Sequence, residues 1–248
     1  KRTSALVGSQ VDAIFYCTGV FNLYHHSSAI TETLKWDWAW ELKRIEGSDS
    51  LEIMIDFGRR HGFEVFWSMR MNDVHDAEHP GLRAEWKTRH LEYLMGYPGE
   101  KFPYGDERAW SAVNYALPQV RQKVFDILED VCGRYDINGI ELDFFRHPVF
   151  FKEQLHGNLV TQAQCDLMTD LLGRVRSMTR QRATARNRPL LVAVRVPDSF
   201  GYAKALGLDV ERWLSENLVD LIIGGCYFVL EPWENLVAKA RKAGVPAY

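Results

Sequence analysis

The sequence predicts an α/β protein of the (β/α)8, or TIM-barrel, class, with about six strands visible and the barrel incomplete at both ends. Two observations predict this fold. Short β-branched and aromatic runs alternate along the chain with longer segments of helical periodicity, as in parallel strands joined by right-handed crossovers. Polar residues follow several of the runs, which favours a barrel over a doubly wound sheet, and no run precedes a glycine-rich phosphate turn.

Five runs rich in β-branched and aromatic residues are expected to be strands. They cover residues 11–17, 63–71, 137–145, 190–196 and 219–228, and a sixth strand is expected to begin at 244–245. Runs of this length and composition are typical of strands that are buried in a parallel sheet.

The segments between these runs have the apolar spacing of helices. Helices are expected at 50–61, 118–134, 161–182, 210–216 and 233–243. The first helix is followed by Gly62, and glycine is favoured just after a helix end. The second begins at Pro118, and proline is favoured in the first turn of a helix. Residues 72–117 form a long loop insertion rich in His, Gly, Pro and Trp, and a loop of that length is usually functional or carries small elements of its own. Without a linker or repeat, we expect one domain over 1–248.

Composition and charge limit the classes of partner. The chain is 46% hydrophobic and 25% charged, with a net charge of -3, so no basic surface for nucleic acid is expected. No apolar run reaches the roughly 20 residues of a membrane span, so membrane insertion is not expected. The four cysteines are far apart, without zinc-binding spacing, and neither a metal nor a cofactor is predicted. The location is not predicted, because no signal segment is present in this sequence; a secreted or periplasmic location is one option, and the oligomeric state is not predicted either.

The segment YDINGIELDFFRHP carries the strongest candidate for a functional residue. Alternation along the strand places Glu141 and Asp143 on the inner face, with Asp143 nearer the C-terminal mouth of the barrel. Buried carboxylates need partners or a function. We expect Glu141 to form an internal ion pair with Arg70 or Arg195, with catalysis as the alternative, and we expect Asp143 to be functional.

Arg146 and His147 follow this strand directly and are candidates for substrate binding. Arg146 could clamp a ligand or hold Asp143 in its ionised form, and a loop salt bridge explains it equally well.

A second polar group lies at the end of the run 63–71. Arg70 and Asn72 share one face of that strand, and Asp73 and His75 follow it, where they could hydrogen-bond the hydroxyls of a sugar. Asp73, His75 and Asp76 could also bind a metal, but no second ligand group of matching spacing follows, and a solvated loop is the commoner explanation.

Further candidates follow the last two runs. Asp198 could be a second catalytic carboxylate or the N-cap of the helix after it. Tyr227 could donate a hydrogen bond into the pocket, and Glu231 is a spare acid. Trp233 could be a stacking platform for a sugar, with a buried Trp at a helix start as the alternative.

The run GIELDFFRHP resembles the motif GI-x-x-D-x-x-R-x-P of glycoside-hydrolase-like barrels that are described as family-10-like. In that group the motif lies at the end of the fourth barrel strand, and its Asp and Arg match Asp143 and Arg146. SMRMNDVHD and VDLIIGGCYF fit the ends of the third and sixth strands of the same layout. The chain departs from chitinase-type barrels, because Phe145 stands where their catalytic Glu would be, and the Asn-Glu pair of true family-10 enzymes is absent.

The resemblance implies a glycoside hydrolase that acts on a carbohydrate through two carboxyl groups. Asp143 would be the nucleophile or charge stabiliser, and the general acid would be Asp198 or Glu231 before Glu141. A catalytically silent carbohydrate-binding barrel is the first alternative. A metal-dependent hydrolase that uses Asp73, His75 and Asp143 is the second. No serine-hydrolase elbow, HExxH motif or P-loop is present.

Overall fold

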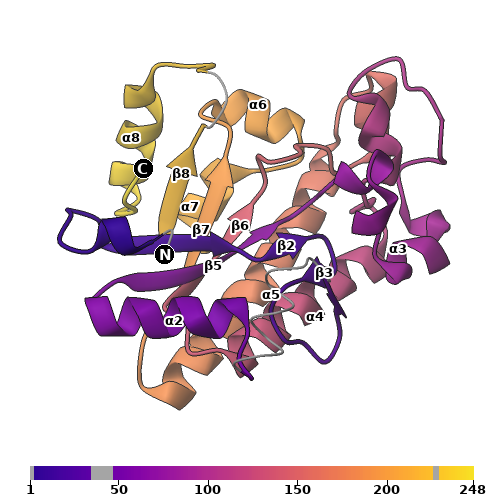
Figure 1. The fold of residues 1–248 in the computed structure, drawn as a ribbon. Coiled ribbons are helices and arrows are strands. Elements are labelled where there is room, and N and C mark those ends of the chain that lie inside the picture. The colour runs from indigo at the N-terminus through magenta and orange to yellow at the C-terminus, as the bar shows by residue number, and fades with distance from the viewer. Residues whose placement is uncertain (1–2, 35–46, 226–228) are drawn as a thin grey trace.

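A curled parallel sheet of five strands forms the centre of the molecule (Figure 1). The computed structural model describes residues 3–34, 47–225 and 229–248. The sheet order is β1 (Ala13–Cys17), β5 (Glu64–Arg70), β6 (Gly139–Asp143), β7 (Leu191–Val196) and β8 (Leu221–Gly224). All five strands run in parallel and turn steadily from β1 to β8, so the sheet forms half of a barrel.

The end of the chain extends this sheet beyond β8. The Gly224 N–H donates to the Tyr248 carbonyl at 2.8 Å, and the Tyr248 N–H donates to the Ile222 carbonyl at 2.9 Å. Ala247 forms a parallel bridge with Ile222, which agrees with the expected sixth strand near this point.

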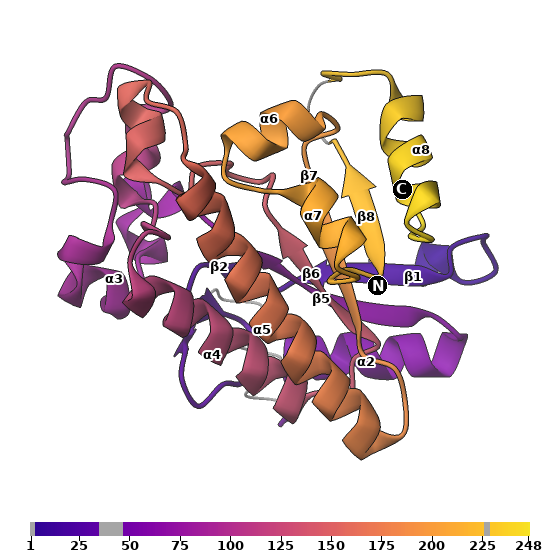
Figure 2. The same ribbon diagram turned by 180° about the vertical axis from the view of Figure 1, so that it is seen from behind.

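Helices cover the outer face of the sheet, as Figure 2 shows for α2, α4 and α5. The helices are α2 (Ser50–His61), α3 (Glu85–Arg89), α4 (Pro118–Arg134), α5 (Gln162–Arg186), α6 (Phe200–Ala205), α7 (Val210–Ser215) and α8 (Trp233–Lys242). The predicted bounds of α2 and α4 are confirmed, and their ends have clear causes. The Asp49 carboxylate accepts the N–H groups of Leu51 and Glu52 at 2.9 and 3.0 Å, and Gly62 ends α2 with a φ of 79°.

The two faces of the sheet differ because side chains alternate along each strand. The outward set packs beneath the helices and is at most 1% exposed: Trp67, Met69, Ile140, Leu142, Val192 and Val194. The inward set forms rows across the strands. Phe15 stacks on Phe66 at 4.6 Å, and Gly139 is their neighbour in the same row. In the next two rows towards the C-terminal ends, polar side chains appear: Ser68 and Glu141 in the first, and Arg70, Asp143 and Arg195 in the second.

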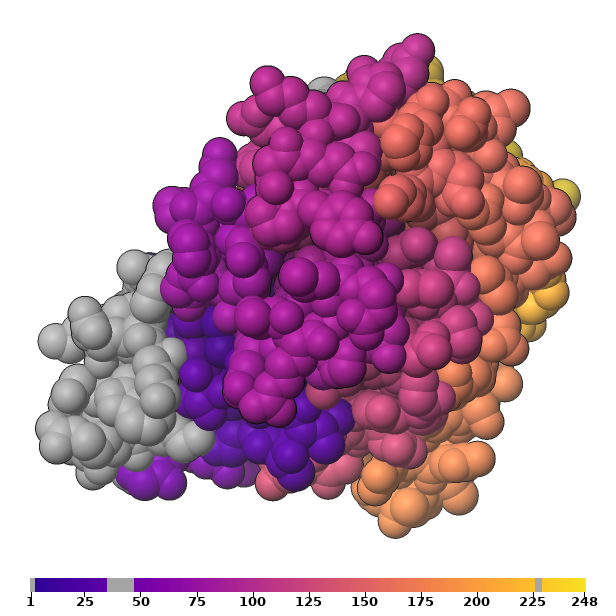
Figure 3. Space-filling model, turned by 90° about the vertical axis from the view of Figure 1, so that its right-hand side faces the viewer, coloured from indigo at the N-terminus to yellow at the C-terminus, as the bar shows by residue number. Residues whose placement is uncertain are grey.

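Short elements that the sequence did not predict cap this half-barrel. A small sheet of β2 (Gly19–Val20), β3 (Leu23–Tyr24) and β4 (Glu32–Thr33) follows β1, and its two-residue strands are too short for a periodic pattern. The segment 72–117 contains α3 and four 3-10 helices, and it fills the centre of the face in Figure 3. The 3-10 helices of the chain are η1 (Ser4–Leu6), η2 (His75–Ala77), η3 (Pro80–Leu82), η4 (Leu91–Tyr93), η5 (Glu107–Ser111) and η6 (Lys152–His156). None of the helices in the described ranges is both long and apolar enough to span a membrane.

Gly139→Ala is expected to lower the free energy of unfolding by about 1–3 kcal/mol. A Cβ there would overlap the Phe66 ring and lie 2.6 Å from the Leu191 carbonyl oxygen. Gly173→Ala in α5 is the control: nothing lies within 4 Å of its Cβ, and a gain of roughly 0.5–1 kcal/mol is expected in urea unfolding. If the two substitutions changed the free energy of unfolding equally, Gly139 would not lie in a closely packed row of inward side chains.

Candidate functional site

A row of alternating charge crosses the sheet at the C-terminal ends of three strands. The register pairs Arg70 of β5 with Asp143 of β6, and Asp143 with Arg195 of β7. In-register residues share a face, so these three side chains all lie on the inner face of the half-barrel. Asp143 lies between two cations and is 2% exposed. This arrangement compensates the cost of burying its charge.

Arg195 is the cation that binds Asp143. Its Nε donates to Oδ1 of Asp143 at 2.9 Å, and its Nη2 donates to Oδ2. The N–H groups of Phe145 and Arg146 also donate to Oδ1, each at 3.0 Å. The sequence suggested Arg146 for this role, but the side-chain hydrogen bonds to Asp143 come from Arg195, and Arg70 adds a nearby positive charge. Cross-strand register brings Arg195 to this position, although it is 52 residues away in sequence.

Arg70 continues the polar network into the loop after β5. Its Nη1 donates to Oδ2 of Asp73 at 2.9 Å, and His75 donates to Oδ1 from its backbone N–H at 3.0 Å and its Nδ1 at 2.8 Å. Burial alone would raise the pKa of Asp73, but the hydrogen bond from His75 and the charge of Arg70 outweigh it and hold the pKa well below its usual range. Asp73 is 1% exposed, so it fixes the loop rather than facing solvent.

Arg146 reaches the other side of the same histidine. Its Nη2 lies 2.9 Å from Nε2 of His75. A guanidinium only donates, so Nε2 accepts, and the imidazole proton is on Nδ1, where it faces Asp73. The His147 ring meets the His75 ring edge-on at 5.0 Å. Burial lowers the pKa of His147 to about 4, so this imidazole is neutral at pH 7.

Asp73, His75 and His147 are the one group with metal-ligand geometry in the described part of the chain, with ligand atoms within 4.8 Å of one another. Guanidinium groups already use two of the three ligand side chains, since Arg70 binds Asp73 and Arg146 binds His75. A cation would have to displace or approach these positive charges. Asp143, which the metal hypothesis included, is instead bound by Arg195.

Glu141 lies one row deeper on β6, in register with Ser68 of β5. It is 5% exposed, and the expected ion pair with Arg70 or Arg195 is not found among the described residues, because those cations bind Asp73 and Asp143. Burial raises the pKa of Glu141, and the charge of Asp143 adds to the rise, while the hydrogen bond from the Ser68 hydroxyl and the charge of Arg195 oppose it without cancelling it. Glu141 therefore holds its proton to higher pH than an ordinary glutamate.

Asp198 and Glu231 lie together beyond β7 and β8. Asp198 is 5% exposed, its Oδ2 accepts the Leu230 N–H at 2.9 Å, and its buried Oδ1 has no hydrogen-bond partner within the described ranges. Asp198 does not cap α6: Ser199 does, accepting the Tyr202 N–H at 3.1 Å. The Ser199 hydroxyl also donates to Glu231 at 2.5 Å, and this bond lowers the pKa of Glu231.

The aromatic candidates have different outcomes. Trp233 begins α8 and is 40% exposed, which contradicts the buried helix-start alternative and leaves its ring available for contacts. Tyr202, on α6, is 39% exposed near the same strand ends. Tyr227 lies outside the described residues.

Two buried side chains anchor the loop after β5: Asn72, which the sequence suggested as a sugar-binding residue, and Lys87, which the sequence analysis did not single out. The Asn72 amide bonds to the N–H and carbonyl of Val113 and to the Val149 carbonyl, so it ties three segments together rather than facing a ligand. Lys87 is 2% exposed and donates to Asp76 and to the Asp73 carbonyl, both at 2.9 Å. The sequence offers no signal for Lys87, because a lysine on a short helix normally points to solvent.

No protein-family model matches the chain, and no curated protein sequence does. Among solved structures, an N-acetylglucosaminidase of glycoside hydrolase family 18 from Paenibacillus barengoltzii is similar at 13% identity and a TM-score of 0.45, over 81% of this chain and 53% of that one. A chitinase from Bacillus thuringiensis gives 11% identity, a TM-score of 0.45 and 80% and 30% coverage. A cycloisomaltooligosaccharide glucanotransferase from Paenibacillus sp. gives 11% identity, a TM-score of 0.47 and 80% and 28% coverage. This chain thus spans about half, or less, of these three proteins, and at TM-scores below 0.5 we draw nothing about its activity from them.

Arg195→Met is expected to cost about 3–5 kcal/mol of the free energy of unfolding, because it leaves the buried Asp143 charge without its main partner. The control is Arg212→Met, whose side chain is 41% exposed and pairs with exposed carboxylates. That change should cost at most about 1 kcal/mol. Chemical unfolding of both variants makes the comparison, and a similar small loss for each would show that Arg195 does not stabilise Asp143.

Asp73→Asn is expected to change how stability depends on acid. The pKa of Asp73 is lowered in the fold, so its contribution is present above the ordinary aspartate pKa of about 4 and is lost as pH falls towards the folded value. The stability difference between wild type and variant should therefore shrink between about pH 5 and pH 2. Asp56→Asn, with a carboxylate 57% exposed, is the control. A difference that stays constant with pH would contradict the low pKa.

Proposed function

We propose that the chain is the core of a glycoside-hydrolase-like (β/α)8 barrel that cleaves a carbohydrate at the C-terminal ends of its strands. Active sites of this architecture lie at that end, and the polar row of Arg70, Asp143 and Arg195 is found there. A glycosidase needs one carboxyl that is protonated and another that is ionised. The proposal therefore depends on how the environments of the carboxyl groups differ.

The observation that carries the proposal is the contrast between Glu141 and Asp143. Both face inward from β6, two residues apart. Asp143 accepts hydrogen bonds from the guanidinium of Arg195 and from two backbone N–H groups. Glu141 has no cation bound to it in the described chain, and burial raises its pKa. Neighbouring carboxyls whose environments favour opposite protonation states are the usual pattern of an acid and its ionised partner.

In the mechanism we propose, Glu141 donates its proton to the glycosidic oxygen as the bond from that oxygen to the anomeric carbon breaks, and Asp143 supports the oxocarbenium-like centre. A water molecule then adds to the anomeric carbon and returns a proton to Glu141. Oδ1 of Asp143 already accepts three hydrogen bonds, from Arg195 Nε and two N–H groups. Oδ2 accepts one, from Arg195 Nη2, so a lone pair is left to face the substrate. Arg195 would hold this oxygen in place, and the neutral His147 and exposed Trp233 would contact sugar hydroxyls and rings.

The other two carboxyls differ in how well they fit the role of acid. Glu231 is a poor proton donor, because the Ser199 hydroxyl lowers its pKa and keeps it ionised. Asp198 is the second candidate for the acid, because its buried Oδ1 has no hydrogen-bond partner within the described ranges and could contact a substrate oxygen. This ranking reverses the order that the sequence suggested, where Asp198 and Glu231 came before Glu141.

Binding without catalysis is the second candidate function. The four hydrogen bonds and the 2% exposure of Asp143 favour it, because a carboxylate held this tightly can be purely structural. The same experiment separates the two functions, since a binding protein would retain a saccharide but release no reducing end.

Glu141→Gln is expected to reduce kcat/KM by about 10²–10⁴-fold on any oligosaccharide that the wild type hydrolyses, because a proton donor is lost. The wild-type rate should fall at high pH as Glu141 loses its proton, above the pH expected for an ordinary glutamate, and the variant should lack this limb. Reducing-end release from a panel of neutral oligosaccharides is the assay.

Two controls complete this test. Glu129→Gln, on the exposed side of α4, should leave the rate unchanged. Asp198→Asn distinguishes the second acid candidate: if it removes the high-pH limb and Glu141→Gln does not, Asp198 is the acid. Binding of an oligosaccharide by a wild type that cleaves none of the panel would favour the non-catalytic function.

A further inference from the structure

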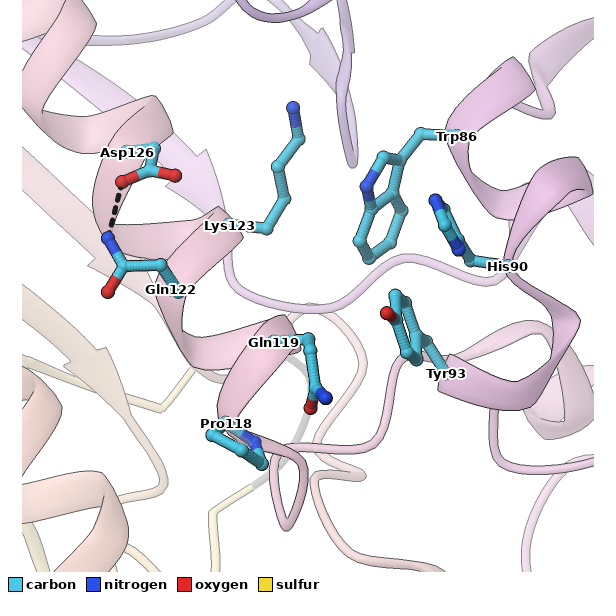
Figure 4. Close-up of a pocket in the computed structure, with 8 residues that line it drawn as sticks. All are labelled: Trp86, His90, Tyr93, Pro118, Gln119, Gln122, Lys123 and Asp126. Atoms are coloured by element: carbon cyan, nitrogen blue, oxygen red, sulfur yellow. Dashed lines mark hydrogen bonds between the residues drawn. The ribbon is translucent and has the colours of Figure 1, made fainter.

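A pocket of about 570 Å³ lies on the flank of the molecule, away from the strand-end row (Figure 4). One side consists of residues from α3 and η4 and the other of the first turns of α4. The lining residues are Trp86, His90, Tyr93, Pro118, Gln119, Gln122, Lys123 and Asp126. None of them belongs to the site described above, and the volume is in the range of roughly 300–1,000 Å³ that is typical of small-ligand sites.

Three rings form one wall of the pocket. The His90 and Tyr93 rings stack at 4.7 Å with an interplanar angle of 12°, and the Trp86 ring lies 5.5 Å from each of them. No hydrogen-bond partner is recorded in the described chain for the indole N–H of Trp86 or the hydroxyl of Tyr93. The wall therefore offers apolar ring faces together with hydrogen-bonding groups at their edges.

The opposite wall is polar and follows the helical repeat. Gln119, Gln122, Lys123 and Asp126 are spaced i, i+3, i+4 and i+7, which places them on one face of α4. The Gln122 amide is oriented at both ends: Nε2 donates to Asp126 at 2.6 Å, and Oε1 accepts from Arg174 at 2.6 Å. Figure 4 shows Gln119 extending into the space beside Tyr93.

The charges of the lining select the class of ligand. One lysine and one aspartate cancel, so the pocket does not favour a phosphate or another anion. Lys123 is also committed, since its Nζ donates to the Ile30 carbonyl at 2.6 Å. What is left is a flat aromatic wall facing amide and carboxylate groups that both donate and accept. An uncharged ligand with an apolar ring face and many hydroxyls has the complementary chemistry.

We propose that this pocket is a second binding site for a neutral saccharide, separate from the strand-end site. One sugar ring would lie against Trp86 and Tyr93, and its hydroxyls would bond to Gln119, Gln122 and Asp126. The proposal does not depend on hydrolysis, because it rests on the pocket's own residues. In a carbohydrate-cleaving protein, such a site would hold a long chain while another part of it is cut.

The test is an NMR titration of the full 248-residue chain with maltohexaose, cellohexaose and N-acetylchitohexaose. At least one of the three should shift the indole N–H signal of Trp86 and the side-chain amide signals of Gln119 and Gln122. The double variant Gln119→Ala/Gln122→Ala, at two exposed positions, should raise the Kd at this site at least tenfold without unfolding the protein. Trp86→Ala should do the same, with its circular dichroism spectrum as the check on folding.

Controls separate this site from the strand-end one. Gln162→Ala, an exposed glutamine at the start of α5, should leave the Kd unchanged, and so should Glu141→Gln and Asp143→Asn. If none of the three hexasaccharides shifts these signals, or if the double variant binds as tightly as the wild type, the proposal is overturned. If the wild type binds a hexasaccharide at the flank pocket but hydrolyses none, the proposed catalytic function is contradicted and the second binding site is not.

Discussion

The pairing of Asp143 with Arg195 is the constraint on which the strand-end site depends. Parallel register places inward side chains of neighbouring strands at the same height, so a buried carboxylate on β6 has its nearest neighbours on β5 and β7. Arg70 and Arg195 flank Asp143 on the neighbouring strands, so the inner face of the sheet can be polar there. The outer face remains an apolar layer under the helices. Because Arg195 pairs with Asp143, Glu141, one row deeper, has no cation bound to it within the described chain. The environments of the two carboxyl groups therefore differ, and burial raises the pKa of Glu141.

The polar network does not end at the sheet. From Arg70 it passes through Asp73 and His75 to Arg146, so the loops after β5 and β6 are held to each other as well as to their strands. A buried lysine, Lys87, fixes the same loop from α3. Because α3 also carries Trp86, the anchoring that positions the strand-end loop also positions the aromatic wall of the flank pocket. The two proposed sites thus share a scaffold but no ligand-binding residue.

Much of the fold could be predicted, because its strands are apolar runs and its main helices begin and end at residues with strong local preferences, such as Asp49, Gly62 and Pro118. The alternation of side chains along the strand also predicted that Asp143 is an inward carboxylate near the C-terminal mouth of the barrel. Its partner could not be predicted, since Arg146 is adjacent in sequence whereas Arg195 arrives only through register. Likewise, Asp198 and Ser199 are both good N-cap residues, and only the backbone geometry decides that Ser199 caps α6. The two-residue strands and the flank pocket leave no periodic signal.

The assignment of Glu141 as the proton donor rests on its holding a proton to higher pH than an ordinary glutamate, beside the Asp143 carboxyl that Arg195 binds. Carbon-13 NMR of side-chain-labelled glutamate measures this directly, with the Glu141 signal assigned by its loss in Glu141→Gln. We expect Glu141 to titrate above the ordinary glutamate pKa of about 4.3, and we expect Asp143→Asn to lower the Glu141 pKa by removing a neighbouring negative charge. A Glu141 signal that titrates at or below the ordinary value would contradict the assignment of Glu141 as the proton donor.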